Sequence, residues 1–582
     1  MQRRRLMVGL FLAVARCTEA PVAPADSGVV DAGPMKQDSG SVEPDASIEV
    51  DAGATDSGFD AGDAGPTDSG FDAGPVDSGF DAGPVPTEWV GVIGNGQSLS
   101  VGANFGGNFS VSHSQPFRGK KLLDKSDPPL YRRDGVGDWA AVPLTEPMRR
   151  FNCPCPSAEY PYNIGGETPH TGMAATLSAL SLADGGPEQV TAHSCVGTSG
   201  AYLTMINKRG PMGTTTGQPY PAGLMETRVF RNIAADAGLG YRVGAVIFTH
   251  GEADWASTTY AQGLYELWQD YNADLKAITG QTQDIPLILT QHNTFPPGVN
   301  LGIAESAEAQ WRAAVTYPGK IVCAGPKYQY SYGDVVHLTA AGYRRLGEKY
   351  AQVFDWVVNQ KKVWKPLYPV KTELSGAKIT VTFHVPVPPL TWADHLPLPH
   401  QVYNAQWKDG RGFEALDSTG FLTISSVAIV GNTVEVLLSA PPSTGLQVRY
   451  AAWTDGLPDG MGGHSFNGAC FGGSESSHMG QLVDSDPFRG YFSAAFEVSS
   501  FRGSRRLNLT SPVGTDIFST RELIEAPQLP KFTVITDKPS TGTHLDISKP
   551  WDGGAAPVYA TVRHDHRNYA VQFILPVPYT EP

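Results

Sequence analysis

The sequence lacks an apolar run of the roughly 20 residues that a membrane-spanning helix needs. Its main N-terminal apolar run, Leu6–Ala15, is too short. An excess of basic residues is also lacking, because 43 Lys and Arg stand against 58 Asp and Glu and give a net charge of -15. This balance argues against nucleic acid as a partner, since no basic face is available to displace phosphate counterions.

Cysteine is scarce, with six residues in 582. Apart from Cys17, five remain, so at least one stays free if the others pair. Cys153-Pro-Cys155 has no second Cys or His pair at zinc spacing. We therefore expect no metal centre at this pair. The presence of six cysteines is compatible with an oxidising compartment.

The acidic charge is concentrated in residues 21–86, where 14 acidic residues stand against Lys36. Residues 87–582 carry a net charge of only -5. The acidic segment repeats Asp-Ser-Gly-Phe-Asp-Ala-Gly at 56–62, 68–74 and 77–83 and lacks the ligand spacing of a calcium loop. Its low aliphatic content and self-repelling charge predict a disordered linker.

Residues 1–20 have the pattern of an export signal, with Arg3, Arg4 and Arg5 before the apolar run. Val14-Ala15-Arg16-Cys17 resembles a bacterial lipobox, although Arg16 stands where a small residue is usual. Two alternatives stay open: a lipid anchor at Cys17, or ordinary cleavage nearby. Either one predicts an exported protein, extracellular or on the cell surface, with no other contact to a membrane.

From Trp89 onward, short apolar runs alternate with helical periodicity. This alternation predicts one domain at 87–364 with a three-layer α/β fold, in which helices cover both faces of a parallel sheet. The expected strands are 89–93, 189–196, 242–249, 285–291 and 320–324. The expected helices are 173–183, 222–236, 257–278, 303–315 and 339–359, the last capped by Thr339.

Beyond residue 364 the helical signal ends. Alternating runs at 378–384, 427–438 and 445–451 predict a β-sandwich at 365–500. Residues 501–582 also have a β pattern, at 532–536 and 558–573, and form either a further β region or the completion of the sandwich.

Two chemically suggestive segments lie at the first and last strand–helix junctions. Gly94-Asn95-Gly96-Gln97-Ser98 follows the first strand, and a serine in such a turn is placed for nucleophilic attack. Gly333-Asp334-Val335-Val336-His337-Leu338 precedes the last helix. Asp334 and His337 supply a base and the acceptor that orients it, which is what a serine nucleophile requires. The alternatives are a helix cap at Ser98 and a structural role for His337.

Two further segments follow middle strands. Val196-Gly197-Thr198-Ser199-Gly200 comes after 189–196, and His250-Gly251-Glu252-Ala253-Asp254 comes after 242–249. Both fall at the sheet edge where the donors of an oxyanion hole would be required.

Together, these four segments resemble the ordered blocks of the SGNH (GDSL-like) hydrolase superfamily, in particular its sialate O-acetylesterase and acetylxylan-esterase-like branch. There the blocks read G-x-x-Q-S, Q-G-E-x-D and D-x-x-H-L, the last followed by a G-Y helix. This chain has Gln97-Ser98, Gly251-Glu252 and Asp334 with His337-Leu338, and its helix contains Gly342-Tyr343. The resemblance covers about 88–360.

The resemblance implies a serine esterase acting on O-acyl groups, above all O-acetyl groups, of a carbohydrate, with no cofactor or metal. Ser98 would be the nucleophile, His337 the base and Asp334 its orienting acceptor. The N–H groups of Ser98 and Gly197 would form the oxyanion hole, with Gly200 as the rival to Gly197. Gln97, Gly251 and Glu252 would support these segments, and Glu252 and Asp254 are interpreted as scaffold.

His250 stands where the branch has Gln. It is either a third oxyanion donor or a buried structural residue. This departure, with the large β region, keeps a second hypothesis open: a surface glycan-binding protein without turnover. A third is a lipid or thioester hydrolase on the same fold. Trp392, Trp407 and Trp453 are either sugar-stacking platforms or core residues.

Overall fold

The structure is a computed structural model. It describes residues 86–103, 112, 115–125, 137–148, 166–210, 219–293, 302–330, 336–338, 340–393, 399, 405–406, 408–452, 480–488, 490–491, 498–502, 506–509, 544–546 and 566–581. Every described residue belongs to one compact unit, Phe80–Pro582. The expected export signal, all but the last residue of the linker, the cap Thr339, the strand at 532–536, Trp407 and Trp453 lie outside the described residues.

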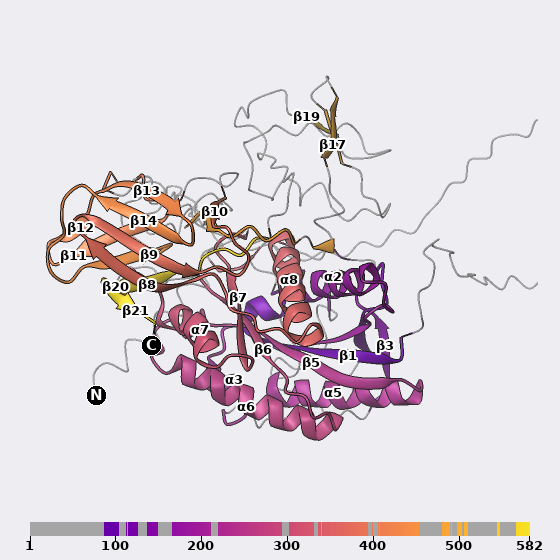
Figure 1. Ribbon diagram of the computed structural model, residues 1–582. Helices are drawn as coiled ribbons and strands as arrows, with labels where there is room; N and C mark the ends of the chain where they lie inside the picture. Colours follow the sequence, from indigo (N-terminus) through magenta and orange to yellow (C-terminus); the bar gives the residue numbers. More distant parts are fainter. Residues whose placement is uncertain are drawn as a thin grey trace, which may run out of the picture. The chain divides into compact units, whose positions relative to one another are not determined.

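A seven-stranded sheet forms the centre of the first part of the unit (Figure 1). Its order is β3-β2-β4-β1-β5-β6-β7, and all neighbouring pairs are parallel except β2 with β3. The strands are β1 (Glu88–Gly96), β2 (Lys120–Asp124), β3 (Trp139–Pro143), β4 (Thr191–Cys195), β5 (Gly240–Thr249), β6 (Leu287–Gln291) and β7 (Ile321–Pro326).

Alternate side chains of the central strands enter two different cores. Val90 and Val92 of β1 pack with helices α2 and α8, whereas Trp89 and Ile93 pack with helices α5, α6 and α7. Helices therefore cover both faces of the sheet, which confirms the predicted three-layer α/β fold. The helices are α2 (Pro169–Ala183), α3 (Leu203–Ile206), α5 (Pro219–Asp236), α6 (Tyr260–Thr279), α7 (Glu305–Thr316) and α8 (Ala340–Phe354).

Helices α2 and α8 pack closely because each has a glycine at the contact. A Cβ atom on Gly172 would lie 2.5 Å from the Arg344 carbonyl oxygen, and one on Gly347 would lie 2.0 Å from that of Pro169. Helix α8 ends at Phe354 and continues as a π-helical turn, Asp355–Asn359, so the predicted helix at 339–359 consists of two kinds of turn. This close packing places α2 and α8 side by side on one face of the sheet.

The remaining described strands form mainly two antiparallel sheets, as predicted for a β-sandwich. One has the order β13-β14-β9-β8-β21 and the other β12-β11-β15-β20; two- and three-stranded sheets, β10-β16 and β17-β18-β19, accompany them. The strands are β8 (Tyr368–Ser375), β9 (Lys378–His384), β10 (Thr391–Trp392), β11 (Phe413–Asp417), β12 (Gly420–Leu422), β13 (Ile424–Val430), β14 (Thr433–Leu438), β15 (Gln447–Tyr450), β16 (Leu482–Val483), β17 (Val498–Arg502), β18 (Arg506–Leu509), β19 (His544–Asp546), β20 (Phe573–Pro576) and β21 (Tyr579–Thr580).

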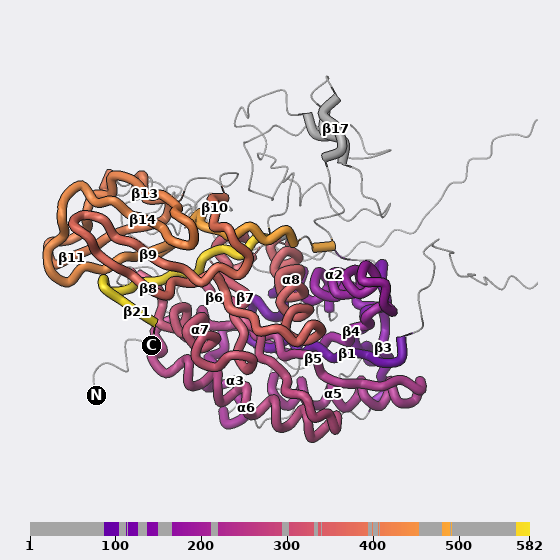
Figure 2. The backbone as a smooth tube through the Cα atoms, in the orientation of Figure 1, coloured from indigo at the N-terminus to yellow at the C-terminus, as the bar shows by residue number. Residues whose placement is uncertain are grey.

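The last described residues complete both large antiparallel sheets. Strand β20 pairs with β15, and β21 pairs with β8, beside which it lies in Figure 2. Within the stretch predicted at 558–573, only Phe573 belongs to β20, which runs on to Pro576. Strands β20 and β21, within residues 573–580, are thus hydrogen-bonded into the two large antiparallel sheets.

The segment just before β20 also binds the central sheet. The Gln291 side chain, at the end of β6, accepts a hydrogen bond from the Gln572 N–H (2.7 Å) and donates one to the Gln572 carbonyl (2.9 Å). The Tyr328 hydroxyl donates to the Ala570 carbonyl at 2.6 Å. Since all these groups are buried, the segment joins the two parts of the unit through polar contacts.

Replacing Gln291 with leucine is expected to lower the free energy of unfolding by about 2–4 kcal/mol, because it removes both hydrogen bonds to buried backbone groups of Gln572. Urea titration followed by tryptophan fluorescence measures the change. Gln189→Leu is the control, since Gln189 pairs with Asn359 at an exposed position and its loss should cost little. Equal effects for the two variants would contradict the prediction.

Candidate active site

The nucleophile turn lies at the end of β1, in the middle of the sheet. Ser98 opens a 3-10 turn, Ser98–Ser100, which is closed by hydrogen bonds from the Ser100 N–H and hydroxyl to the Gln97 carbonyl (2.9 and 2.7 Å). Gly96 has φ +142°, and a Cβ atom there would lie 2.1 Å from the Thr249 carbonyl oxygen. Only glycine fits this close approach of β1 to β5, which turns the chain so that Ser98 follows at the strand end.

Ser98 and His337 meet at this edge of the sheet. The His337 Nε2 atom lies 2.8 Å from the Ser98 Oγ atom, although the two residues are 239 positions apart in the chain. His337 lies between β7 and α8, and Ser98 has 5% of its surface exposed. The distance is that of a hydrogen bond through which a proton can pass. Asp334, the expected orienting acceptor, lies outside the described residues.

Gly197 lies directly against the nucleophile turn. A Cβ atom on Gly197 would be 1.9 Å from the Ser100 Oγ atom and 2.7 Å from the Gly96 carbonyl oxygen, so only glycine fits. The next residue, Thr198, donates its N–H to the Gly96 carbonyl at 3.0 Å. Within the described part of the chain, neither the Ser98 N–H nor the Gly197 N–H forms a hydrogen bond. Both predicted oxyanion donors are thus near one another and available.

The rival donor, Gly200, lies three residues further along the same loop. It has φ +69°, and a Cβ atom there would meet nothing within 4 Å. Gly200 therefore serves the bend of the loop rather than a close approach to Ser98, and Gly197 is the better placed of the two.

His250 has two interpretations, an oxyanion donor or a buried structural residue, and the contacts of its ring favour the second. Its Nε2 atom lies 2.9 Å from the Ala201 carbonyl oxygen and its Nδ1 atom 2.8 Å from the Tyr260 hydroxyl. With 1% of its surface exposed and both ring nitrogens occupied, no donor of His250 is left for a substrate. The alternative, a buried structural residue, fits the contacts.

The other expected supporting residues join the loops at the strand ends. The Gln97 side-chain oxygen accepts the Ala253 N–H at 3.2 Å, which links the β1 loop to the β5 loop. The Asp254 carboxylate accepts the Leu203 N–H at 2.7 Å, which links the β5 loop to the β4 loop. Gly251 has φ +128°, and its carbonyl accepts the Ser306 hydroxyl at 2.8 Å. These contacts agree with the interpretation of this segment as scaffold.

Glu252 forms a buried ion pair that the sequence did not reveal. Its carboxylate binds the ammonium of Lys327, which follows β7, and both side chains are almost fully buried. Burial by itself raises the pKa of Glu252, but the neighbouring Lys327 charge outweighs it and lowers that pKa to about 2. His292 is also buried nearby, and burial lowers its pKa to about 4. The ion pair of Glu252 with Lys327 therefore fixes the β5 loop to the β7 loop.

A second buried polar cluster lies behind the nucleophile turn, between the loop after β3 and the start of α2. Glu146 accepts the Thr168 N–H at 3.0 Å, and Glu167 accepts the Ser112 hydroxyl at 2.5 Å. The Gly102 carbonyl, at the end of the nucleophile turn, accepts the Gly166 N–H at 2.8 Å. Burial and the neighbouring Glu167 carboxylate raise the pKa of Glu146 to about 8.

Glu146 makes the stability of the fold depend on pH. Its pKa in the folded state lies above its value of 4.5 in the unfolded chain, so the folded protein retains a proton that the unfolded chain releases. Its contribution is complete below pH 4.5 and is lost as the pH rises to 8, by up to about 1.4 kcal/mol per pH unit. Glu146→Gln should flatten this decline in urea titrations from pH 5 to 8, whereas Glu373→Gln, at an exposed position, should not. Parallel slopes for wild type and Glu146→Gln would contradict the prediction.

Other features of the described residues do not compete with this site. No group of three or more His, Cys, Asp or Glu side chains in the described ranges could hold a metal ion. Among the helices that the structure describes, none is both long and apolar enough to cross a membrane. Cys195 and Cys323 are both buried, and the Cys195 thiol donates a hydrogen bond to the Ser100 carbonyl at 3.4 Å. Trp392 is half-buried, with the Arg411 guanidinium 4.9 Å from its ring centre.

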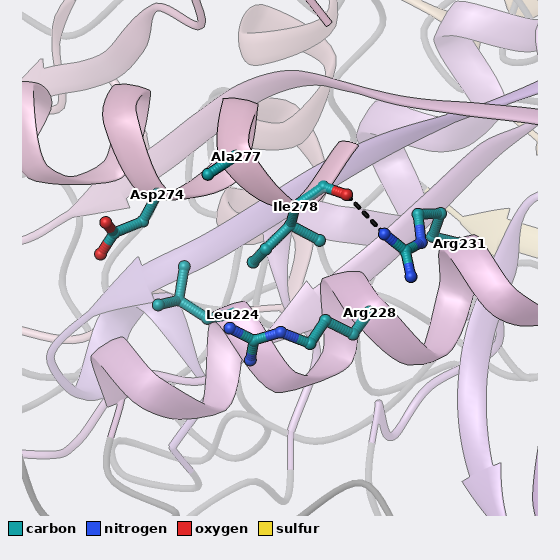
Figure 3. Close-up of a pocket in the computed structure, with 6 residues that line it drawn as sticks. All are labelled: Leu224, Arg228, Arg231, Asp274, Ala277 and Ile278. Atoms are coloured by element: carbon teal, nitrogen blue, oxygen red, sulfur yellow. Dashed lines mark hydrogen bonds between the residues drawn. The ribbon is translucent and has the colours of Figure 1, made fainter. Parts of the chain in front are cut away.

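A surface hollow lies between α5 and α6 (Figure 3). Arg231 donates a hydrogen bond to the Ile278 carbonyl at 2.6 Å across it. None of its lining residues belongs to the loops after β1, β4, β5 or β7, so it is separate from the Ser98 site. The lining residues are Leu224, Arg228, Arg231, Asp274, Ala277 and Ile278.

Comparison with known proteins gives similarity to solved structures but no match to a family model or to a curated protein. One similar structure is XAC1771, a carbohydrate acetylesterase from Xanthomonas citri, with a TM-score of 0.42 and 14% identity over 69% of this chain and 81% of that one. Another is NanS, with a TM-score of 0.31 and 14% identity over 46% of this chain and 97% of that one. Est24, a carbohydrate acetylesterase from Sinorhizobium meliloti, has a TM-score of 0.23 and 16% identity over 47% and 99%. At these values the likeness assigns neither an activity nor a substrate to this chain.

Proposed function

We propose that this chain is a serine esterase that hydrolyses O-acyl esters, in the first place O-acetyl esters, of carbohydrates through an acyl-serine intermediate. The observation that carries the proposal is the 2.8 Å contact between Ser98 Oγ and His337 Nε2. A serine hydroxyl becomes a nucleophile when an imidazole within hydrogen-bond distance accepts its proton.

In the first step, Ser98 Oγ attacks the acyl carbon and His337 Nε2 accepts the Ser98 proton. The negative charge on the acyl oxygen is stabilised by the N–H groups of Ser98 and Gly197, which have no partner among the described residues. Collapse of the tetrahedral intermediate breaks the bond to the sugar oxygen, which takes the proton from His337. Asp334, three residues before His337, would hold the imidazole in the tautomer that accepts at Nε2.

In the second step, His337 removes a proton from water, and the hydroxide attacks the acyl-serine. The second tetrahedral intermediate releases the carboxylic acid and returns the proton to Ser98. His337 thus acts as base and then as acid in each step, and Ser98 is the nucleophile of the first step and the leaving group of the second. The carbohydrate as substrate is supported by the resemblance of the sequence blocks to the sialate O-acetylesterase branch.

Two experiments test this function. Incubation with a fluorophosphonate probe, followed by peptide mass spectrometry, should place the label on Ser98. Screening O-acetylated polysaccharides should give acetate release, at higher rates than release from long-chain acyl esters. Labelling that persists in Ser98→Ala would exclude Ser98 as the nucleophile, and a preference for long-chain esters would favour a lipid hydrolase.

We also propose that the esterase is exported and that residues 21–86 tether it, with residues 1–20 as the signal. The pattern of three arginines before an apolar run supports this. The domain limits 87–364, 365–500 and 501–582 belong to the same proposal, with 573–580 completing the sandwich sheets. Palmitate incorporation that disappears in Cys17→Ser would identify a lipid anchor, whereas a mature N-terminus elsewhere would identify ordinary cleavage.

A further inference from the structure

The buried His250 ring connects two loops and a helix. It lies directly after β5, and its Nε2 atom approaches the Ala201 carbonyl in the loop after β4. Its Nδ1 atom approaches the hydroxyl of Tyr260, the first residue of α6. On one side the ring stacks on Phe248, with 4.9 Å between ring centres. The imidazole therefore spans from the rigid end of a central strand to the loop that contains Gly197.

The partners fix the protonation of this ring. A carbonyl oxygen only accepts hydrogen bonds, so Nε2 carries the hydrogen and donates it to Ala201. In the neutral ring Nδ1 then has a lone pair, to which the Tyr260 hydroxyl donates. Burial lowers the pKa of His250, which keeps the ring neutral near pH 7. One tautomer is thus held by two directional contacts.

Residues 197–203 are held at three points. Thr198 donates to Gly96 at the start, Ala201 accepts from His250 in the middle, and Leu203 donates to Asp254 at the end. The side chains of His250 and Asp254 both reach from the β5 loop. Of the three contacts, that of His250 is the one at the middle of the loop, at the Ala201 carbonyl. Without it, the middle of the stretch between Thr198 and Leu203 would lose the hydrogen bond at the Ala201 carbonyl.

We propose that His250 is a positioning residue that holds the loop 197–203, and with it the Gly197 N–H, against the Ser98 turn. This inference rests on the proposed esterase function, because it assigns the oxyanion donor that the loop presents. Gly197 already lies where no side chain would fit beside Ser100, so a small displacement of the loop moves its N–H away from the developing oxyanion. A misplacement of about 1 Å lowers catalysis by up to about 100-fold.

Two substitutions of His250 separate the hydrogen bond from the volume of the ring. His250→Phe keeps a ring but removes the donor to Ala201, whereas His250→Gln keeps an N–H at the end of a side chain of similar length. His384→Phe is the matched control, since His384 contacts the Pro366 carbonyl in the sandwich part. The measurements are kcat and KM for p-nitrophenyl acetate, the rate of fluorophosphonate labelling, and hydrogen–deuterium exchange of peptides covering 197–203.

For His250→Phe we expect kcat and the labelling rate to fall by about 10- to 100-fold with little change in KM. Exchange over 197–203 should become faster in this variant, His250→Gln should recover most of both losses, and His384→Phe should change neither. If His250→Phe does not fold, Tyr260→Phe provides the test, because it leaves the imidazole in place and removes the hydroxyl that donates to Nδ1. It should accelerate exchange over 197–203 and lower kcat to a smaller extent.

Several results would overturn the inference. Unchanged kcat in His250→Phe would do so, and so would a lower kcat with unchanged exchange over 197–203, which would indicate a direct donor. For Tyr260→Phe, exchange and kcat like those of wild type would have the same meaning. A wild-type protein that neither turns over esters nor labels at Ser98 would instead overturn the proposed function. Exchange over 197–203 would still report in that case whether His250 holds the loop.

Discussion

Replacing Ser98 with alanine should lower kcat for p-nitrophenyl acetate by a factor on the order of 10⁴ or more. The reason is that the 2.8 Å contact with His337 then has no hydroxyl to deprotonate, and acyl transfer to the enzyme is lost. Any remaining rate comes from the oxyanion donors and from binding. The substitution leaves the turn intact, since the hydrogen bonds that close it come from Ser100.

His337→Ala should cost about as much as Ser98→Ala, and the double variant little more than either one. Such non-additivity is expected when two residues act as one unit. Ser181→Ala is the control, because Ser181 lies in α2 and its hydroxyl donates to the Ser178 carbonyl. Costs of the two active-site variants that simply add would contradict a shared proton-transfer step, and activity retained by Ser98→Ala would exclude the mechanism.

The second large effect concerns stability. Lys327→Met should lower the free energy of unfolding by about 3–5 kcal/mol, because the Glu252 carboxylate then stays buried without its cation. Chemical denaturation at pH 7 measures the change. Lys208→Met, which breaks the half-exposed pair with Asp274, should cost no more than about 1 kcal/mol.

The double variant Lys327→Met with Glu252→Gln should be more stable than Lys327→Met alone, since it removes the uncompensated charge. The single variant should also regain stability on acidification, because Glu252 loses the interaction that holds its pKa at about 2 and takes up a proton more readily. A cost below about 1 kcal/mol for Lys327→Met would show that the pair does not hold the two loops together.

Most of the central sheet was predictable because apolar runs, as in β1 and β5, alternate along the chain with segments of helical periodicity. Strands β1, β4, β5, β6 and β7 agree with the predicted positions within a few residues. Strands β2 (Lys-Lys-Leu-Leu-Asp) and β3 (Trp-Ala-Ala-Val-Pro) were missed. They are short strands at one edge of the sheet, and their stability comes from pairing with each other and with β4 rather than from local pattern.

Some residues of the site could be predicted from their type and their place in the sequence, and others only from contacts that form on folding. Ser98 and His337 could be found because their residue types and their places at strand ends indicate chemistry. The role of His250 could not, since its partners Ala201 and Tyr260 are known only once the loops are folded. Lys327 gave no signal at all, because a single lysine after a strand is usually exposed.

The pairing of Gln291 with Gln572 joins positions 281 residues apart, and Tyr328 reaches Ala570 over 242. On the ribosome, the loops at the ends of β6 and β7 therefore stay without these partners until residues 570–572 have been synthesised. A fold built in this way acquires these long-range contacts late. In the export that we propose for this chain, such a delay keeps the chain from compacting before it has crossed the membrane.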